Sequence, residues 1–288
     1  MKIGVSSYSF SSLMGEGRET QLSIIKTAKE MGFDGIEFTD LNTPEGLTET
    51  EYALKIAEEC DKYSLPVISY TIGADMLRFE GGSNEKEIGR VCRKLDVAKA
   101  LGAPSLRHDT AWGIPEGLPF KTFDDCLETI ADGARKITRY AKSLGIKTMT
   151  ENHGFFCQDS ERVERIIKAV GDSNFGSLID IGNFSCADED NVSAVSRMLP
   201  YAFHIHAKDF HIKSAQDADP GEGFFKSRGG NYLRGAIIGQ GNVDVYSCLK
   251  EIASSGYDGF ISVEFEGMED CLKGIRIGKE NLVRFLAG

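Results

Sequence analysis

The chain has 288 residues, of which 41% are hydrophobic and 27% charged, and its formal net charge is −11. This composition is ample for a buried core, and the negative charge argues against nucleic-acid binding through a broad basic face. The first residues are too polar for a signal peptide, and no apolar run approaches the roughly 18 residues of a membrane helix. The seven cysteines are scattered singly, without a C-x-x-C pair. We therefore expect a cytoplasmic protein with free thiols and neither nucleic acid nor membrane as a partner.

Strand-like and helix-like segments alternate along the sequence. Strands are expected at 2–8, 36–38, 66–72, 105–108, 146–151, 175–181, 202–207 and 259–265. Helices are expected at 18–31, 48–63, 84–101, 120–144, 160–170, 191–199, 243–254 and 270–286, where apolar residues recur at helical spacing. Eight strand–helix pairs in 288 residues average 36 residues each, which fits βα units joined by right-handed crossovers.

This alternation predicts an α/β protein, and specifically a single (β/α)8 TIM barrel that spans residues 1–288. The related turns Gly32-Phe33-Asp34-Gly35 and Gly256-Tyr257-Asp258-Gly259, before the second and eighth strands, support repeated βα units. A doubly wound open sheet is the alternative. That fold usually carries a glycine-rich fingerprint after its first strand, and Ser6-Ser7-Tyr8-Ser9 is not one.

Four potential metal ligands stand at the ends of four consecutive predicted strands: Glu151, Asp180, His206 and Glu264. Active sites of TIM barrels lie at the carboxyl ends of the strands, so these side chains are expected along one arc of the barrel mouth. A single strand-end carboxylate is usually a helix cap or a solvated charge, whereas four on adjacent strands indicate a shared site. Three carboxylates and one imidazole suit one divalent cation, with Mn²⁺, Mg²⁺ or Co²⁺ favoured and Zn²⁺ or Fe²⁺ left open.

The alternation of side chains along a strand decides which neighbours share the mouth with these ligands. If His206 points inward, so do His204 and Lys208, and if Glu264 points inward, so does Glu266. We expect His204 to be a core or supporting histidine because it lies one step deeper in the barrel. Glu266 lies beyond the strand end, so we expect Glu264 to be the ligand.

A further set of polar and aromatic side chains near the strand ends is suited to binding a substrate. Alternation lets only one of Arg107 and His108 face the mouth, Glu37 would line it at the second strand, and Lys208 could bind an oxyanion. Trp112 could stack on a sugar ring, although a lone tryptophan in a loop more often packs within it, and His153 is as readily a polar turn residue. The candidate substrate-binding residues are His153, Asn183, Arg107, His108, Lys208, Glu37 and Trp112.

The longest connection, 209–241, is rich in glycine and follows the strand that carries His206. A loop of this length in a compact domain is usually functional or disordered. Its basic residues Lys226, Arg228 and Arg234 could clamp a phosphate or carboxylate, but we favour a mobile lid with solvated charges. We expect this loop to close over the mouth and to carry part of the substrate specificity.

The sequence resembles the xylose-isomerase-like TIM barrels, the sugar phosphate isomerase/epimerase family, over its full length. The residues that carry the resemblance are Ile3-Gly4-Val5-Ser6, Gly35-Ile36-Glu37, Glu151-Asn152-His153-Gly154, Asp180-Ile181-Gly182-Asn183, His206-Ala207-Lys208-Asp209, Gly239-Gln240-Gly241 and Val263-Glu264-Phe265-Glu266-Gly267. The resemblance implies a metal bound by the four strand-end ligands, with Glu151 and Glu264 also acting as acid and base. The chain departs from the family pattern at Asn183, where the epimerases usually carry a histidine.

The expected function is that of a divalent-metal-dependent isomerase or epimerase of a small sugar, keto-sugar or polyol, acting through an enediolate. A dehydratase of the inosose type on the same metal site is the alternative. An endonuclease-IV-like phosphodiesterase is less favoured, because its three-metal cluster needs more than the five histidines present. A non-catalytic sugar-binding barrel would lack the ligands, and all four are there. The expected partner is a small carbohydrate, with a homo-oligomer left open.

Overall fold

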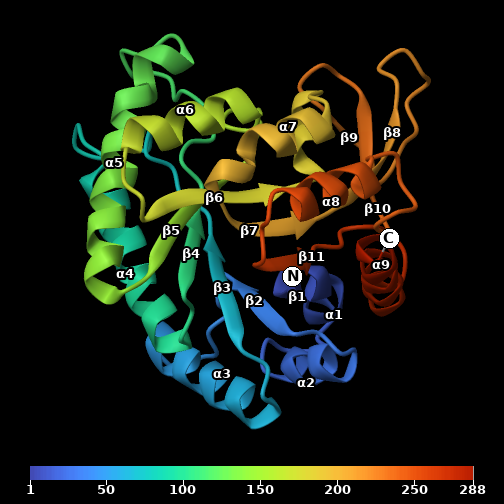
Figure 1. Cartoon of the computed structure of the whole chain (residues 1–288). Helices are drawn as coiled ribbons and strands as arrows, with labels where there is room; N and C mark the ends of the chain where they lie inside the picture. Colours follow the sequence, from blue (N-terminus) through green and yellow to red (C-terminus); the bar gives the residue numbers. More distant parts are fainter. Residues whose placement is uncertain (288) are drawn as a thin grey trace.

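Eight parallel strands close into a barrel in the computed structural model, which describes residues 1–287 (Figure 1). Their order around the barrel is β1-β11-β7-β6-β5-β4-β3-β2, so the predicted (β/α)8 barrel is confirmed. The strands are β1 (Lys2–Ser6), β2 (Gly35–Thr39), β3 (Val67–Ile72), β4 (Ser105–His108), β5 (Lys147–Glu151), β6 (Phe175–Asp180), β7 (Ala202–Ala207) and β11 (Phe260–Val263).

The helices surround the barrel as an outer layer (Figure 1). They are α1 (Ser11–Gly15), α2 (Ser23–Glu30), α3 (Glu49–Tyr63), α4 (Glu85–Leu101), α5 (Phe123–Leu144), α6 (Ser160–Val170), α7 (Asn191–Met198), α8 (Val245–Ser254) and α9 (Cys271–Leu286). Local chemistry sets their ends. Thr48 and Glu51 form a capping box at the start of α3, and Gly145 ends α5 with a φ of 73°, which a residue without Cβ adopts easily.

The predicted side-chain parity is confirmed where it matters for the site. On β7, Ile205 and Ala207 belong to the apolar core, while His204 and His206 are buried polar side chains that contact each other edge to face. On β11, Ile261 and Val263 likewise join the core. The barrel therefore turns its apolar residues toward the helices and its polar residues inward.

Two element ends differ from the prediction and change what reaches the mouth. Strand β1 ends at Ser6, because the Ser6 side chain caps a 3₁₀ turn over Ser7–Phe10, and Tyr8 consequently sits in this turn. Strand β11 ends at Val263, so Glu264 is the first residue after the strand.

The segment 209–241 is not the irregular loop that its glycine content suggested. It forms a three-stranded antiparallel sheet in the order β8-β10-β9, with β8 (Asp209–Lys213), β9 (Phe225–Lys226) and β10 (Tyr232–Ala236), beside the barrel mouth (Figure 1). Buried Asp209 fixes the chain between β10 and α8, since its carboxylate accepts hydrogen bonds from the amides of Gly239, Gly241 and Val243.

The turn between β9 and β10 is fastened to the barrel rather than free. The Asp188 carboxylate accepts from Ser227 Oγ at 2.6 Å, from Asn231 Nδ2 at 2.7 Å and from the Gly229 amide. Arg228 pairs with Asp159 at 2.9 Å and donates to the Phe155 carbonyl. These contacts fit a fixed wall better than the mobile lid that the sequence favoured.

The basic residues of this segment do not form the anion clamp considered above. Arg228 is engaged as just described, Arg234 lies 3.9 Å from Glu269, and Lys226 lies over the Tyr232 ring. All three are absent from the residues that line the two cavities described below.

Replacing Asp188 by alanine is expected to loosen this turn without weakening metal binding. The substitution removes one acceptor from three donors, and each lost hydrogen bond is worth about 0.5–1.5 kcal/mol. Hydrogen exchange at 227–231 should therefore become faster than in the wild type. Asp217→Ala is the control, since Asp217 accepts only a bond within its own turn, from Ser214. Equal exchange rates in wild type and Asp188→Ala would show that the turn is held by other contacts.

Candidate metal centre and substrate cavity

The four predicted ligands come together at one arc of the barrel mouth. Glu151 ends β5, Asp180 ends β6, His206 lies near the end of β7 and Glu264 follows β11, and these strands are neighbours in the barrel. One potential ligand atom from each lies within 4.8 Å of the others, and all four side chains are buried. That separation is compatible with bonds of about 2.1 Å to one shared cation.

The donor set fits a divalent cation. Within the described chain, Asp180 Oδ2 and His206 Nδ1 are buried without a hydrogen-bond partner. They lie 3.9 Å apart, and His206 Nδ1 is also 3.4 Å from Glu264 Oε1. Buried polar atoms are normally paired. Asp180 Oδ2 has only the ion-pair contact with Lys208 at 3.3 Å, and His206 Nδ1 faces the carboxylates of Asp180 and Glu264, so both atoms are candidate ligands for a cation. Burial and, to a smaller extent, the neighbouring carboxylate of Glu264 raise the pKa of Asp180 to about 7.

Lys208 supplies a positive charge beside Asp180 and Glu264. Its Nζ lies 2.6 Å from Glu264 Oε2, 3.3 Å from Asp180 Oδ2 and 3.5 Å from Glu266, and it donates to Asn183 Oδ1 at 3.2 Å. Burial alone would lower the lysine pKa, but Asp180 and Glu264 raise it well above its ordinary value. Conversely, burial would raise the pKa of Glu264, but Lys208 and His206 hold it well below its usual range. Glu264 is therefore a carboxylate near neutral pH.

Glu151 is held by one hydrogen bond and one ion pair from different elements. Asn183 Nδ2 donates to its Oε1 at 2.9 Å, and Arg107 Nε lies 2.7 Å from its Oε2. Asn152 performs a similar task for Asp180, since its side chain exchanges two hydrogen bonds of 2.9 Å with the Asp180 backbone. These contacts fix the positions of two candidate ligands, the Glu151 side chain and the Asp180 backbone.

Glu37 does not line the mouth, contrary to the prediction. It is fully buried beneath His206, with Oε1 2.9 Å from His206 Nε2 and Oε2 3.6 Å from His204 Nε2. His204 lies 2.9 Å from Ser262 Oγ, which agrees with its expected supporting role. A bond from His206 Nε2–H to Glu37 leaves Nδ1 free to face the carboxylates, an arrangement that orients histidine ligands in metal sites.

We expect Glu37→Gln to weaken binding of Mn²⁺ by about 10–100-fold, the usual effect of losing such an outer partner. The amide can still accept from His206 but no longer supplies the negative charge that makes the imidazole a stronger ligand. Isothermal titration of the chelator-treated protein measures the affinity. Glu87→Gln, which changes another buried glutamate that pairs with Arg90 on α4, should bind as the wild type does. An unchanged affinity in Glu37→Gln would rule out this support.

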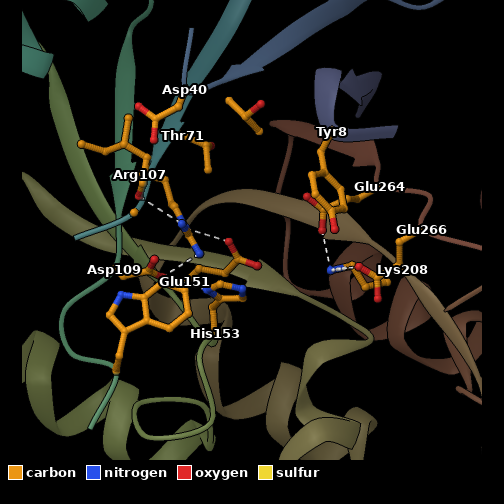
Figure 2. A pocket seen from close by; sticks show the side chains of 14 residues that line it. Tyr8, Asp40, Thr71, Arg107, Asp109, Glu151, His153, Lys208, Glu264 and Glu266 are labelled. Atoms are coloured by element: carbon orange, nitrogen blue, oxygen red, sulfur yellow. Dashed lines mark hydrogen bonds and ion pairs between the residues drawn. The ribbon is translucent and has the colours of Figure 1, made fainter. Parts of the chain in front are cut away.

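A cavity of about 280 Å³ is lined by two of the four candidate ligands, Glu151 and Glu264 (Figure 2). Arg107 Nη2 lies 2.8 Å from Asp109 Oδ1, and His153 Nδ1 lies 3.0 Å from the same oxygen. The His153 ring meets Trp112 edge to face at 5.2 Å. The candidate residues Arg107, Glu151, His153, Lys208, Glu264 and Trp112 line this cavity, together with Tyr8, Asp109 and Glu266.

His108 lies outside the cavity, as the alternation with Arg107 required. Its Nδ1 is 2.8 Å from the Asp109 carbonyl and its ring packs near Phe175. Burial lowers the pKa of His108 to about 4, so the ring is neutral near neutral pH. We therefore remove it from the candidate substrate contacts.

Sequence reasoning missed Tyr8 and Asp109 as cavity residues. Alternation would have placed Asp109 on the same side as Arg107, had β4 been expected to run one residue further. Tyr8 was not predicted as a cavity residue because it was expected in the first strand, whereas it lies in the 3₁₀ turn after β1. Burial and Glu266 raise the pKa of Tyr8, so its hydroxyl keeps its proton near neutral pH.

The family profile of the xylose isomerase-like TIM barrel matches residues 25–284. The chain belongs to this family. Among curated relatives, an inosose dehydratase of Clostridium perfringens is 24% identical over 142 residues, a match that covers 48% of this chain and 47% of that enzyme. The match therefore spans about half the length of each protein.

Solved structures share the fold over the whole chain. L-ribulose 3-epimerase superposes with a TM-score of 0.73 at 17% identity, covering 99% of this chain and 94% of that one. The IOLI protein, solved with a bound zinc atom, superposes with a TM-score of 0.75 at 16% identity, covering 100% of this chain and 98% of that one. Among residues 1–287, none of the helices has the length and apolar composition needed to cross a bilayer.

Proposed function

We propose that this family member binds one divalent cation through Glu151, Asp180, His206 and Glu264 and moves a proton at a carbon next to the carbonyl of a small keto-sugar or polyol. The observation that carries the proposal is the convergence of these four buried side chains, two of which line a cavity. The metal-bearing and epimerase structures of the same fold support it. A cation held there would polarise the carbonyl and stabilise the negative charge that proton loss creates.

In this proposal the two glutamates carry the proton. They belong to the outer strands of the arc, β5 and β11, and Figure 2 shows them reaching the cavity from different sides. One carboxylate takes the proton from the α-carbon, and that electron pair forms the carbon–carbon double bond of an enediolate. Protonation of the same carbon from the other face inverts it, whereas protonation of the neighbouring carbon moves the carbonyl.

The other cavity residues orient the substrate in this account. Arg107 and Asp109 hold Glu151 and His153 in place, and Lys208 keeps Glu264 ionised. His153, Trp112 and Tyr8 face the cavity with their rings and are suited to contact sugar hydroxyls and ring faces. Asn183 reaches the cluster through its amide, which binds but does not shuttle protons.

Asn183 favours a dehydratase as the second candidate. The epimerases of the family usually carry a histidine at this position, and the relatives matched over half the chain include inosose dehydratases. In that reaction the electron pair of the enediolate expels a β-hydroxyl, which takes a proton and leaves as water. The first step and its residues are the same.

Product analysis distinguishes the two candidates. The Mn²⁺-loaded protein is incubated with free ketoses and with a keto-inositol, and products are followed by NMR and ultraviolet absorbance. Epimers or aldose–ketose pairs without absorbance change support the first candidate, and a conjugated enone supports the second. Hydrolysis of phosphate esters without change at any carbon would contradict both.

A further inference from the structure

A second lobe of about 470 Å³ continues from the cavity that Glu151 and Glu264 line. It lies between the β5–α6 turn and the three-stranded sheet, and it is larger than the first lobe. The two lobes share the side chains Tyr8, Trp112, His153, Lys208 and Glu266. A molecule held at the metal ligands can therefore extend into the second lobe without leaving the cavity.

The second lobe is walled by aromatic rings that are unusually exposed. Trp112 is 50% exposed, Phe155 44% and Phe225 36%, and all three line the lobe. Phe210 completes the wall by meeting Phe225 edge to face at 5.7 Å. Large exposed apolar side chains gathered in one concavity are typical of a binding site rather than of an ordinary surface.

The chain holds Phe155 in this position against its backbone preference. Its φ is +63°, in the left-handed region that a residue with a Cβ seldom adopts. Gln158 Oε1 accepts from the Phe155 amide, and Arg228 of the β9–β10 turn donates to its carbonyl. The small sheet and the β5–α6 turn are thereby joined across the lobe, and the aromatic wall is fixed before a ligand binds.

We infer that the substrate is a glycoside, whose keto-sugar ring sits at the metal ligands while the ring attached to it packs against the aromatic wall of the second lobe. This inference rests on the proposed function and specifies its substrate class. A free monosaccharide would occupy the first lobe and leave the exposed rings in water. A second ring has the flat apolar faces that aromatic side chains contact, whether that ring is another sugar or an aryl group.

The glycosidic bond constrains where the chemistry occurs. It occupies the anomeric carbon, so the ketone of such a substrate must lie at another ring carbon. The proton moved by Glu151 and Glu264 then belongs to a ring carbon beside that ketone. Binding energy from the remote ring can offset the cost of orienting the reacting ring in the transition state. The second lobe should therefore raise kcat/KM and not only affinity.

The test compares ring-oxidised keto-glucoses that differ only at the anomeric oxygen: the free sugar and its methyl, phenyl and glucosyl glycosides. Solvent deuterium exchange gives kcat/KM for each with the metal-loaded protein. We expect the phenyl or glucosyl compound to exceed the methyl compound by about 10-fold or more, as apolar pocket contacts usually provide. A higher kcat/KM for the phenyl compound alone identifies the substrate as an aryl glycoside. A higher kcat/KM for the glucosyl compound alone identifies it as a disaccharide.

Variants test whether the higher kcat/KM of the phenyl or glucosyl compound depends on the second lobe. Phe225→Ala and Phe155→Ala should remove most of the difference in kcat/KM between the larger glycosides and the methyl glycoside. Deuterium exchange of the methyl glycoside should persist. Tyr246→Ala, which removes a similarly exposed aromatic ring that packs on Phe285 outside the lobe, should keep the difference in kcat/KM. Equal kcat/KM for all four compounds in the wild type would overturn the glycoside inference while leaving the proposed proton transfer intact.

A binding measurement covers the case in which no compound exchanges. Trp112 is the sole tryptophan of the chain and lines both lobes, so its fluorescence reports occupancy without turnover. Phenyl β-glucoside or cellobiose binding about 10-fold more tightly than methyl β-glucoside, with the difference lost in Phe225→Ala, would support the second lobe although the proposed reaction had failed. Equal binding of all three would overturn the inference.

Discussion

Glutamine at position 151 or 264 is expected to lower turnover by about 10²–10⁴-fold, the usual contribution of a positioned acid or base. Each substitution keeps the shape of the side chain and removes its ability to exchange a proton. The loss should persist in excess Mn²⁺ that restores occupancy of the site. Steady-state rates on the substrate found by product analysis, at several metal concentrations, measure it.

Glu269→Gln is the matched control for this loss. Glu269 follows Glu264 closely in the chain and lies 3.9 Å from Arg234, away from the cavity wall. It should retain most of the wild-type rate. Full recovery of Glu151→Gln or Glu264→Gln by added metal would show that the residue is a ligand alone, and the acid/base assignment would then be wrong.

Asp180→Asn is expected to weaken metal binding by at least about 100-fold, since losing an outer partner already costs about 10–100-fold. Asp180 Oδ1 accepts from the amides of Gly182 and Asn183 at 2.8 and 2.9 Å, and an asparagine oxygen can keep both bonds. The amide nitrogen must then take the place of Oδ2 and present hydrogen atoms to the cation. The fold is kept while the ligand is lost, and isothermal titration with Mn²⁺ measures the difference.

Glu264 and Glu266 provide a sharper comparison within one segment. Both carboxylates lie near Lys208, but only Glu264 belongs to the group of four. Glu264→Gln should lose metal affinity and Glu266→Gln should keep it. The opposite result would move the ligand by two residues and contradict the assignment.

The repeating pattern of the sequence was sufficient to predict the barrel, because strand length, helix spacing and glycine stops recur about every 36 residues across the chain. The four ligand candidates followed from the same pattern, since parallel strands place their ends at one rim. Alternation also predicted that His204 points inward and that only one of Arg107 and His108 faces the site, and the structure shows that this residue is Arg107. These conclusions need only the positions of residues within strands.

Predictions failed where tertiary contacts rather than local pattern decide the outcome. The segment 209–241 looked irregular because of its glycines, although Asp209–Lys213 alternates between polar and apolar residues as a strand does. Glu37 was expected at the mouth, and its depth below His206 depends on the stagger between strands β2 and β7, which the sequence does not show. Asp188 and Arg228 meet partners about 40 and 70 residues away, which no local rule connects.

Solvent deuterium incorporation tests the central claim most directly. The Mn²⁺-loaded protein converts its substrate in deuterated water, and mass spectrometry and NMR locate deuterium in the product. Proton abstraction by Glu151 or Glu264 predicts deuterium at the carbon next to the carbonyl, with incorporation abolished in Glu151→Gln and Glu264→Gln. Turnover in which that carbon keeps its original hydrogen would indicate a hydride shift and contradict the account.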